Sequence, residues 1–172
     1  MKKILRIITI PYYNRLWKDI PNNKNILDLG CGYNSPLFLI PKKYKKVTGI
    51  EKCKTHFIKA REIGNYDVLF NIGIKEYCKE YIRSYDCILL SDVIEHIKKD
   101  EGIEIIEMLK SRSKRIIIFT PLGFTIQQNM DGNKYNKHLS GWYSPELEKL
   151  GFKTKIIQNY TEKALYGVWK ND

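Results

Sequence analysis

The feature that most constrains the fold is the stretch from Asn25 to Gly32, which reads Asn-Ile-Leu-Asp-Leu-Gly-Cys-Gly. Its first part is an apolar run, which predicts a buried strand over Asn25–Leu29. Its second part is Gly-x-Gly, which predicts a tight turn at the end of that strand. Glycine suits such a turn because it adopts positive φ angles and lets the backbone approach a ligand closely.

A second strand, predicted over Lys46–Ile50, ends in the acidic residue Glu51, about 20 residues after the glycine turn. In a doubly wound sheet, a carboxylate at the tip of the second strand accepts hydrogen bonds from a ribose diol. Between the two strands, Ser35 as N-cap and Pro36 as first helical residue predict a helix over residues 35–40.

The rest of the chain continues the alternation of strands and helices. We expect further helices over residues 55–63, 74–83, 100–110 and 144–150, and one or two short helices between residues 2 and 20. We expect further strands over residues 66–70, 84–92, 114–120, 152–158 and 164–169. This order predicts an α/β, doubly wound, Rossmann-like and mostly parallel seven-stranded sheet with an antiparallel C-terminal strand. The expected organisation is a single domain over residues 1–172, with an N-terminal helical segment over 1–24 and a Rossmann-like core over 25–172.

Two motifs give the chain a family resemblance. Asp-x-Gly-x-Gly at residues 28–32, with an acid closing the next strand, resembles the cofactor site of class I S-adenosylmethionine-dependent methyltransferases. The segment Tyr-Asp-x-Ile-Leu-x-Ser-Asp-Val-Ile-Glu-His at residues 85–96 resembles the fourth-strand signature of the same class. The later text Asp-Gly-Asn and His-x-Ser-Gly-Trp, within residues 131–142, resembles a group of uncharacterised bacterial and archaeal methyltransferases.

The resemblance implies S-adenosylmethionine as cofactor, with the glycine turn under its methionine and ribose end and Glu51 holding the ribose hydroxyls. The cofactor-binding residues that it implies are Asp28, Gly30, Cys31, Gly32, Glu51, Lys52, Gly73, Ile74, Ser91 and Asp92. Many family members carry an acid after the third strand that contacts adenine. Here that position is Gly73, so the contact would pass to backbone groups or to Asn71.

Two histidines border the expected reaction centre. His96 follows the fourth strand, and His138 lies in a long polar segment, residues 124–143, that follows the fifth. Either is a candidate general base for an oxygen or nitrogen acceptor. His56 is expected at the surface, away from this rim. Trp142 has two interpretations, since it either stacks on a ring or sugar of the substrate or anchors the loop.

A metal-dependent alternative rests on four residues. Asp92, Glu95, His96 and His138 resemble the metal-binding set of the small-RNA 3′-terminal 2′-O-methyltransferases, whose pattern has Glu where Asp92 stands. In that family a divalent metal ion grips the terminal ribose hydroxyls, and carboxylates with imidazoles suit such an ion. Glu-His after the fourth strand also occurs in methyltransferases that bind no metal.

The composition of the chain bears on its partners and on its location in the cell. The net charge of +11 attracts nucleic acid or an acidic partner, although lysine is used heavily along the whole chain as a matter of composition. No apolar run reaches the roughly 18 residues of a membrane span. The four cysteines lack Cys-x-x-Cys spacing, which favours a reducing cytoplasm and speaks against a zinc site.

The sequence therefore predicts an S-adenosylmethionine-dependent methyltransferase that acts on a small molecule or an exposed end group by O- or N-methylation. One alternative is a metal-assisted RNA 2′-O-methyltransferase with RNA as partner. Another is a non-catalytic, cofactor-binding regulatory or scaffolding protein. Steeply salt-dependent RNA binding would favour the RNA alternative.

Overall fold

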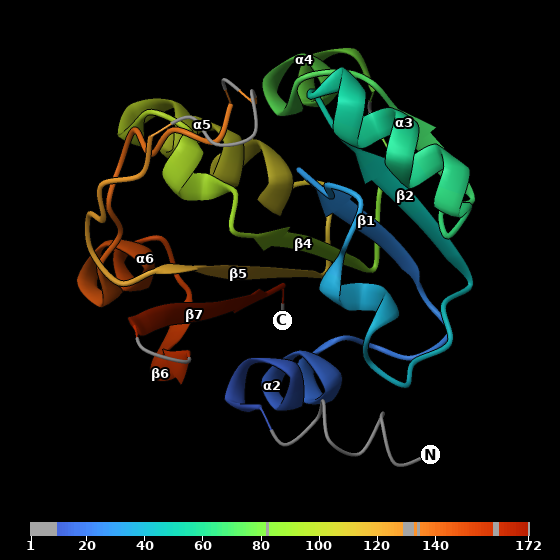
Figure 1. Cartoon of the computed structure of the whole chain (residues 1–172). Coiled ribbons are helices and arrows are strands. Elements are labelled where there is room, and N and C mark those ends of the chain that lie inside the picture. The colour runs from blue at the N-terminus through green and yellow to red at the C-terminus, as the bar shows by residue number, and fades with distance from the viewer. Residues whose placement is uncertain (1–9, 82, 129–132, 134, 160–161, 172) are drawn as a thin grey trace.

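A computed structural model describes residues 10–81, 83–128, 133, 135–159 and 162–171. The expectations for residues 2–9 lie outside the described residues. The centre of the fold is one seven-stranded sheet with the strand order β3-β2-β1-β4-β5-β7-β6 (Figure 1). The strands are β1 (Asn25–Leu29), β2 (Lys46–Ile50), β3 (Val68–Phe70), β4 (Cys87–Ser91), β5 (Arg115–Pro121), β6 (Lys153–Asn159) and β7 (Glu162–Lys170).

The strand directions confirm the predicted sheet. The pairs β1–β2, β1–β4, β2–β3 and β4–β5 are parallel. β7 lies antiparallel to both β5 and β6, so it is the antiparallel C-terminal strand of the prediction. The carboxyl ends of the parallel strands meet at one edge of the sheet, which is where a doubly wound fold binds ligands.

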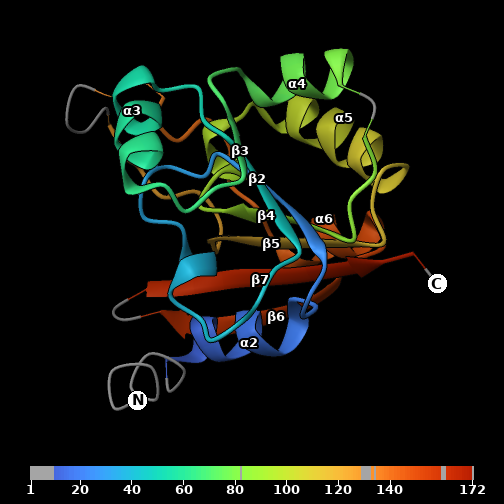
Figure 2. The same cartoon turned by 90° about the vertical axis from the view of Figure 1, so that its right-hand side faces the viewer.

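Helices cover both faces of the sheet. The longer helices are α2 (Pro11–Asp19), α3 (Lys54–Ile63), α4 (Ile74–Glu80), α5 (Lys99–Lys110) and α6 (Ser144–Lys149), and the short 3-10 helices are η1 (Pro36–Phe38) and η2 (Ile94–His96). α4, α5 and α6 contribute to the apolar core on one face, whereas α2 and η1 contribute to the core on the other (Figures 1 and 2). No helix among the described residues is long and apolar enough to cross a membrane.

The alternation of side chains along the central strands builds these two cores. In β5, Ile116 and Ile118 pack on the side of α5, whereas Ile117 and Phe119 pack on the side of α2. A strand that is buried on both faces requires this continuous apolar run, because successive side chains point to opposite faces.

The helix predicted over residues 35–40 is wrong in length. Only the single turn η1 forms, and its N-cap is Ser35 as predicted, since Ser35 Oγ accepts a hydrogen bond from the backbone N–H of Leu37 (3.3 Å). Pro41 explains the short turn, because the residue before a proline is disfavoured in the helical conformation. β3 is likewise shorter than the predicted 66–70, and α4 shorter than 74–83.

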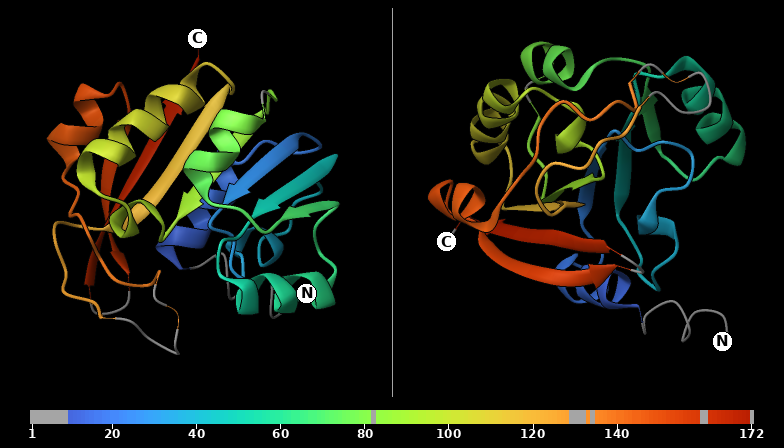
Figure 3. Two further views of the ribbon diagram at one scale, coloured as in Figure 1. Left: turned by 90° about the horizontal axis from the view of Figure 1, so that it is seen from above. Right: turned by 60° about the vertical axis from the view of Figure 1, so that its left-hand side comes forward.

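The segment between β5 and α6 extends over the carboxyl ends of the strands. Of its described residues, Tyr135, Asn136, Lys137 and Leu139 line the same cavity as residues at the ends of β2 and β3. Figure 3 shows the course of this segment beside the sheet. This segment, together with the strand ends, forms the site described next.

Candidate active site

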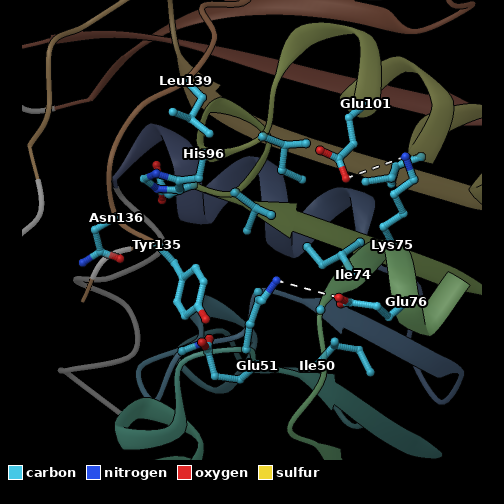
Figure 4. A pocket seen from close by; sticks show the side chains of 18 of the residues that line it. Ile50, Glu51, Ile74, Lys75, Glu76, His96, Glu101, Tyr135, Asn136 and Leu139 are labelled. Atoms are coloured by element: carbon cyan, nitrogen blue, oxygen red, sulfur yellow. Dashed lines mark hydrogen bonds and ion pairs between the residues drawn. The ribbon is translucent and has the colours of Figure 1, made fainter.

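A cavity of about 660 Å³ opens at the carboxyl ends of β1, β2, β3 and β4. Figure 4 shows Glu51 and His96 on different walls of this cavity. The sequence-predicted residues that line it are Gly30, Gly32, Glu51, Lys52, Gly73, Ile74, Asp92 and His96. Asp28, Cys31 and Ser91 lie outside its lining, and so does His138.

Glu51 is held in place by two backbone donors. Its Oε2 accepts a hydrogen bond from the N–H of Gly32 (2.9 Å), and its Oε1 accepts one from the N–H of Cys53 (2.6 Å). The side chain is buried at the cavity wall. A carboxylate oxygen accepts more than one hydrogen bond, so both oxygens keep capacity for hydroxyl donors of a ligand.

Asn71 supports Glu51 from behind. Its Nδ2 donates to the carbonyl oxygens of Glu51 (2.8 Å) and Lys52 (3.0 Å). The donors of this amide therefore serve the turn after β2, Asn71 lies outside the cavity lining, and its contact with adenine stays a prediction.

The two glycines of the turn are needed for different reasons. At Gly30, with φ of +63°, a Cβ would lie 2.7 Å from Cγ2 of Val93. At Gly32, with φ of +53°, nothing lies within 4 Å of a Cβ, so the backbone conformation alone favours glycine. Both glycines leave the cavity wall free of side chains at this point.

Asp28 lies behind the turn and contacts protein groups. Its Oδ2 accepts hydrogen bonds from Ser35 Oγ (2.6 Å) and from the Tyr66 hydroxyl (2.8 Å). Burial raises the pKa of Asp28 to about 6. Asp28 was predicted to contact a cofactor directly. In the structure its carboxylate instead bonds to protein groups and links the turn after β1 to the N-cap of η1 and to Tyr66.

Cys31 and Ser91 are also placed differently from the prediction. Cys31 is buried next to the turn, and burial raises the pKa of its thiol. Ser91 Oγ accepts a hydrogen bond from the Tyr12 hydroxyl (2.8 Å) and donates one to Asp92 Oδ2 (3.2 Å). Ser91 therefore acts on Asp92, which lines the cavity.

The prediction that His56 lies away from the site is wrong. His56, in α3, lines the same cavity as Glu51, and its ring meets Tyr33 edge-on with centroids 5.2 Å apart. The ligand-type atoms of Glu51, Cys53 and His56 all lie within 4.8 Å of one another. The spacing Glu-x-Cys-x-x-His was visible in the sequence, but only the start of α3 directly after Cys53 turns His56 back toward the strand end.

A smaller cavity of about 310 Å³ adjoins the first. Two residues, Asp92 and His96, line both cavities. The smaller cavity is also lined by Glu95, Phe119, Pro121, Thr125, Ile126, Gln127, His138, Glu162, Lys163 and Ala164. The two histidines predicted for the acceptor side thus come together there, with ring centroids 4.9 Å apart.

Each of these imidazoles is oriented by a carbonyl oxygen. His138 Nδ1 lies 2.7 Å from Thr125 O, and His96 Nδ1 lies 3.2 Å from Lys137 O. Because a carbonyl oxygen only accepts, these contacts assign the ring proton of the neutral form to Nδ1 and leave Nε2 as an acceptor. Burial lowers the pKa of His96, which favours the neutral imidazole.

Glu95 joins the two histidines to form a compact group. Ligand-type atoms of Glu95, His96 and His138 all lie within 4.8 Å of one another, and Asp92, the fourth residue of the predicted metal set, is not part of this group. Glu95 is buried, and its Oε2 accepts a hydrogen bond from Thr120 Oγ1 (2.9 Å). Burial raises the pKa of Glu95 to about 8.

Trp142 anchors the loop that carries His138. Its side chain is fully buried, and its Nε1 donates to Ser140 Oγ (3.0 Å) and to Ile94 O (3.3 Å). Lys99 Nζ lies over the indole ring, 3.9 Å from its centroid. Of the two interpretations of Trp142, the structure supports the anchor, because no face of a fully buried ring is left for a substrate.

Comparisons with known proteins agree with this geometry. A family model described as a methyltransferase domain matches residues 5–171. (S)-Tetrahydroprotoberberine N-methyltransferase from Eschscholzia californica is 32% identical over 87 residues, which cover 46% of this chain and 24% of that protein. The chain thus spans about a quarter of the length of this curated relative.

Solved structures share the fold. Magnesium protoporphyrin IX methyltransferase from Synechocystis PCC 6803 with bound SAH superposes with a TM-score of 0.68 at 14% identity, covering 99% of this chain and 86% of that one. The small RNA methyltransferase HEN1 gives a TM-score of 0.66 at 16% identity, covering 94% of this chain and 25% of that one. With the family model matched over nearly the whole chain, the protein belongs to the methyltransferase-domain family.

Proposed function

We propose that the protein transfers a methyl group from S-adenosylmethionine to a small molecule or an exposed end group, by O- or N-methylation. The observation that carries this proposal is the Glu51 carboxylate, which Gly32 and Cys53 hold at the wall of a large cavity. A fixed carboxylate with free acceptor capacity at the tip of the second strand suits a ribose diol.

The residues of the cavity fit a nucleoside ligand with an amino-acid tail. Glu51 would accept hydrogen bonds from the ribose hydroxyls, and the side chains of Ile50, Ile74 and Ile105 supply apolar surface for a purine. Gly30 and Gly32 would leave room for the methionine end, because neither places a Cβ in the cavity. Asp92 and His96 would then lie nearest the methyl group, where the two cavities meet.

S-Adenosylmethionine supplies a methyl group already activated by a sulfonium charge, so the protein mainly has to align the acceptor. The smaller cavity would hold that acceptor between Asp92 and the two histidines. In the neutral tautomer assigned above, Nε2 of each histidine is an acceptor, so either His96 or His138 would take the proton of a hydroxyl acceptor.

Calorimetric titration with S-adenosylmethionine and S-adenosylhomocysteine tests this function. We expect both to bind the wild type and to bind Glu51→Ala about 10- to 100-fold more weakly, the range for lost hydrogen bonds to a charged group. Glu62→Ala removes an exposed carboxylate of α3 outside the cavity lining and should leave both affinities unchanged. If neither ligand binds the wild type, the protein has no such activity on its own.

The compact group of Glu95, His96 and His138 favours a second candidate, metal-assisted 2′-O-methylation of RNA. One carboxylate and two imidazoles match the ligand preferences of manganese or zinc, and a bound ion would lower the pKa of a ribose hydroxyl. The net charge of +11 would attract RNA.

Titration with Mn²⁺ tests this second candidate. If this candidate function is right, Mn²⁺ binds the wild type and does not bind His138→Ala. The control is His56→Ala, whose residue lines the other cavity, and it should bind Mn²⁺ as the wild type does. RNA affinity should also fall steeply as salt rises. Equal Mn²⁺ binding by wild type and His138→Ala would contradict it.

We also propose a cytoplasmic location. Cys31, Cys53, Cys78 and Cys87 are all free and buried. Unpaired thiols are typical of a reducing compartment. Titration of the denatured protein, purified without reductant, should find four free thiols, and a disulfide would contradict this proposal.

A further inference from the structure

The junction between the two cavities has one carboxylate, that of Asp92. Asp92 and His96 are the two residues that line both the larger and the smaller cavity. A methyl group that passes from a donor in one cavity to an acceptor in the other must pass beside these two side chains.

The Asp92 carboxylate is fixed from behind. Its Oδ2 accepts a hydrogen bond from Ser91 Oγ (3.2 Å), which in turn accepts one from the Tyr12 hydroxyl (2.8 Å). Tyr12 is buried and stacked on Phe119, with ring centroids 3.9 Å apart. The backbone is fixed too, since Asp92 has φ of +53° and its N–H donates to Phe119 O (2.8 Å).

The carboxylate has acceptor capacity, and no cation within the described part of the chain pairs with it. Among the residues that the structure describes, Ser91 alone donates a hydrogen bond to it, and no Lys, Arg or His forms an ion pair with it. The other charged or titratable groups around the smaller cavity are Glu95 and His96 of η2, Glu162 and Lys163 of β7, and His138. Asp92 is exposed to the two cavities, and a fixed carboxylate without a cationic partner attracts a positively charged ligand group beside it.

We propose that the acceptor is an amine and that Asp92 holds the positive charge on its nitrogen. The inference rests on the proposed methyl transfer from S-adenosylmethionine and narrows its acceptor. The nitrogen lone pair forms the new N–CH₃ bond, the electron pair of the S–CH₃ bond stays on sulfur, and the positive charge passes from sulfur to nitrogen. A fixed carboxylate beside the nitrogen stabilises this developing charge. A hydroxyl acceptor, by contrast, would have to lose a proton and would end neutral.

Sinefungin tests the proposal without an acceptor. This analogue of S-adenosylhomocysteine carries a primary ammonium group on a carbon that replaces the sulfur, so its ammonium points where the transferred methyl group would be. Both ligands are titrated calorimetrically at pH 8 in the presence of EDTA, which removes any metal ion from the histidine cluster. We expect the wild type to bind sinefungin about 10- to 100-fold more tightly than S-adenosylhomocysteine, as for a charge-assisted hydrogen bond.

The variants assign that preference to Asp92. Asp92→Asn keeps the shape, and asparagine adopts positive φ readily, so the ratio of the two affinities isolates the effect of the charge, and the sinefungin preference should fall to about 2-fold or less. Tyr12→Phe, a positioning variant that keeps the ring stacking, should reduce the preference partially. Glu162 is a carboxylate that lines only the smaller cavity, and Glu162→Gln should retain the sinefungin preference.

Two outcomes would overturn the inference alone. One is a wild type that binds S-adenosylhomocysteine but does not prefer sinefungin. The other is a preference that survives in Asp92→Asn, since another group would then hold the ammonium. If the wild type fails to bind S-adenosylhomocysteine at all, the proposed function fails first and the acceptor inference falls with it.

Discussion

At the scale of single residues, Asp28 carries a charge that the fold penalises. It is 2% exposed, and burial raises its pKa from an ordinary value of 3.8 to about 6. Between these two values the folded protein keeps a proton that the unfolded chain releases, so this residue makes the protein less stable as pH rises from about 4 to about 6. We expect Asp28→Asn to gain stability relative to wild type over that range, by up to about 3 kcal/mol.

Urea unfolding of wild type and Asp28→Asn between pH 4 and pH 7 measures this difference. Asp86 provides a control of opposite sign, because its carboxylate accepts a hydrogen bond from the N–H of Asn25 and its pKa is lowered. Asp86→Asn should therefore lose relative stability as pH rises through the acid range below about 4, so its curves are extended down to about pH 2. Parallel curves for wild type and Asp28→Asn would show that burial does not perturb Asp28.

Residues also mark where sequence reasoning succeeded and where it could not. Gly30, Gly32 and Glu51 were predicted at the site because a strand end followed by glycine or by an acid is a local signal, and all three line the cavity. The chain of hydrogen bonds from Tyr12 through Ser91 to Asp92 was not predicted. It joins residues 79 positions apart in sequence, and no local pattern specifies such a contact.

At the scale of elements, the contact between α5 and the loop before α6 depends on Gly102. In the middle of a helix, alanine is ordinarily about 1 kcal/mol better than glycine. Here a Cβ would lie 2.9 Å from Cζ2 of Trp142 and 3.4 Å from Cγ1 of Ile94. Trp142 cannot easily shift, because its Nε1 is bonded to Ser140 and to the backbone of Ile94. We therefore expect Gly102→Ala to destabilise the protein by about 1–3 kcal/mol.

Equilibrium urea unfolding tests that expectation against Glu107→Ala, an exposed position of the same helix that should change stability by less than about 0.5 kcal/mol. If Gly102→Ala instead gains the stability that helix propensity predicts, the indole must be free to move, and the anchoring role of Trp142 is wrong.

Most elements were predictable because their signals are local. The continuous apolar runs of β4 and β5 define buried parallel strands, and Gly64 ends α3 with φ of +74°. The capping signal of the helix predicted over residues 35–40 was correct. The predicted length was wrong because only five residues separate Ser35 from Pro41. The chain therefore crosses from β1 to β2 with one helical turn.

At the scale of the whole molecule, the larger cavity joins segments that are far apart in sequence. Besides the glycine turn after β1 and two residues of α5, four segments contribute to its lining: the end of β2 with the start of α3, residues within 73–79, residues within 92–97, and the loop before α6 with residues 135–137 and 139. A ligand that contacts all four must be released before any of them opens fully. Each of these openings is then less favourable by the factor 1 + [L]/Kd, which is about 100 at 100 times the Kd.

Amide hydrogen exchange with and without S-adenosylhomocysteine measures this coupling. We expect exchange to slow by up to about 100-fold in the peptides of all four segments, including residues 135–139. Peptides in β6, which lies at the edge of the sheet and outside both cavity linings, should exchange at an unchanged rate wherever local opening leaves the ligand bound. In Glu51→Ala at the same ligand concentration, the protection should fall in all four segments together, because the lost affinity lowers one shared factor. Protection confined to the β2 and β3 ends would mean that residues 135–139 do not close over the ligand, and the acceptor site would then have to be sought without them.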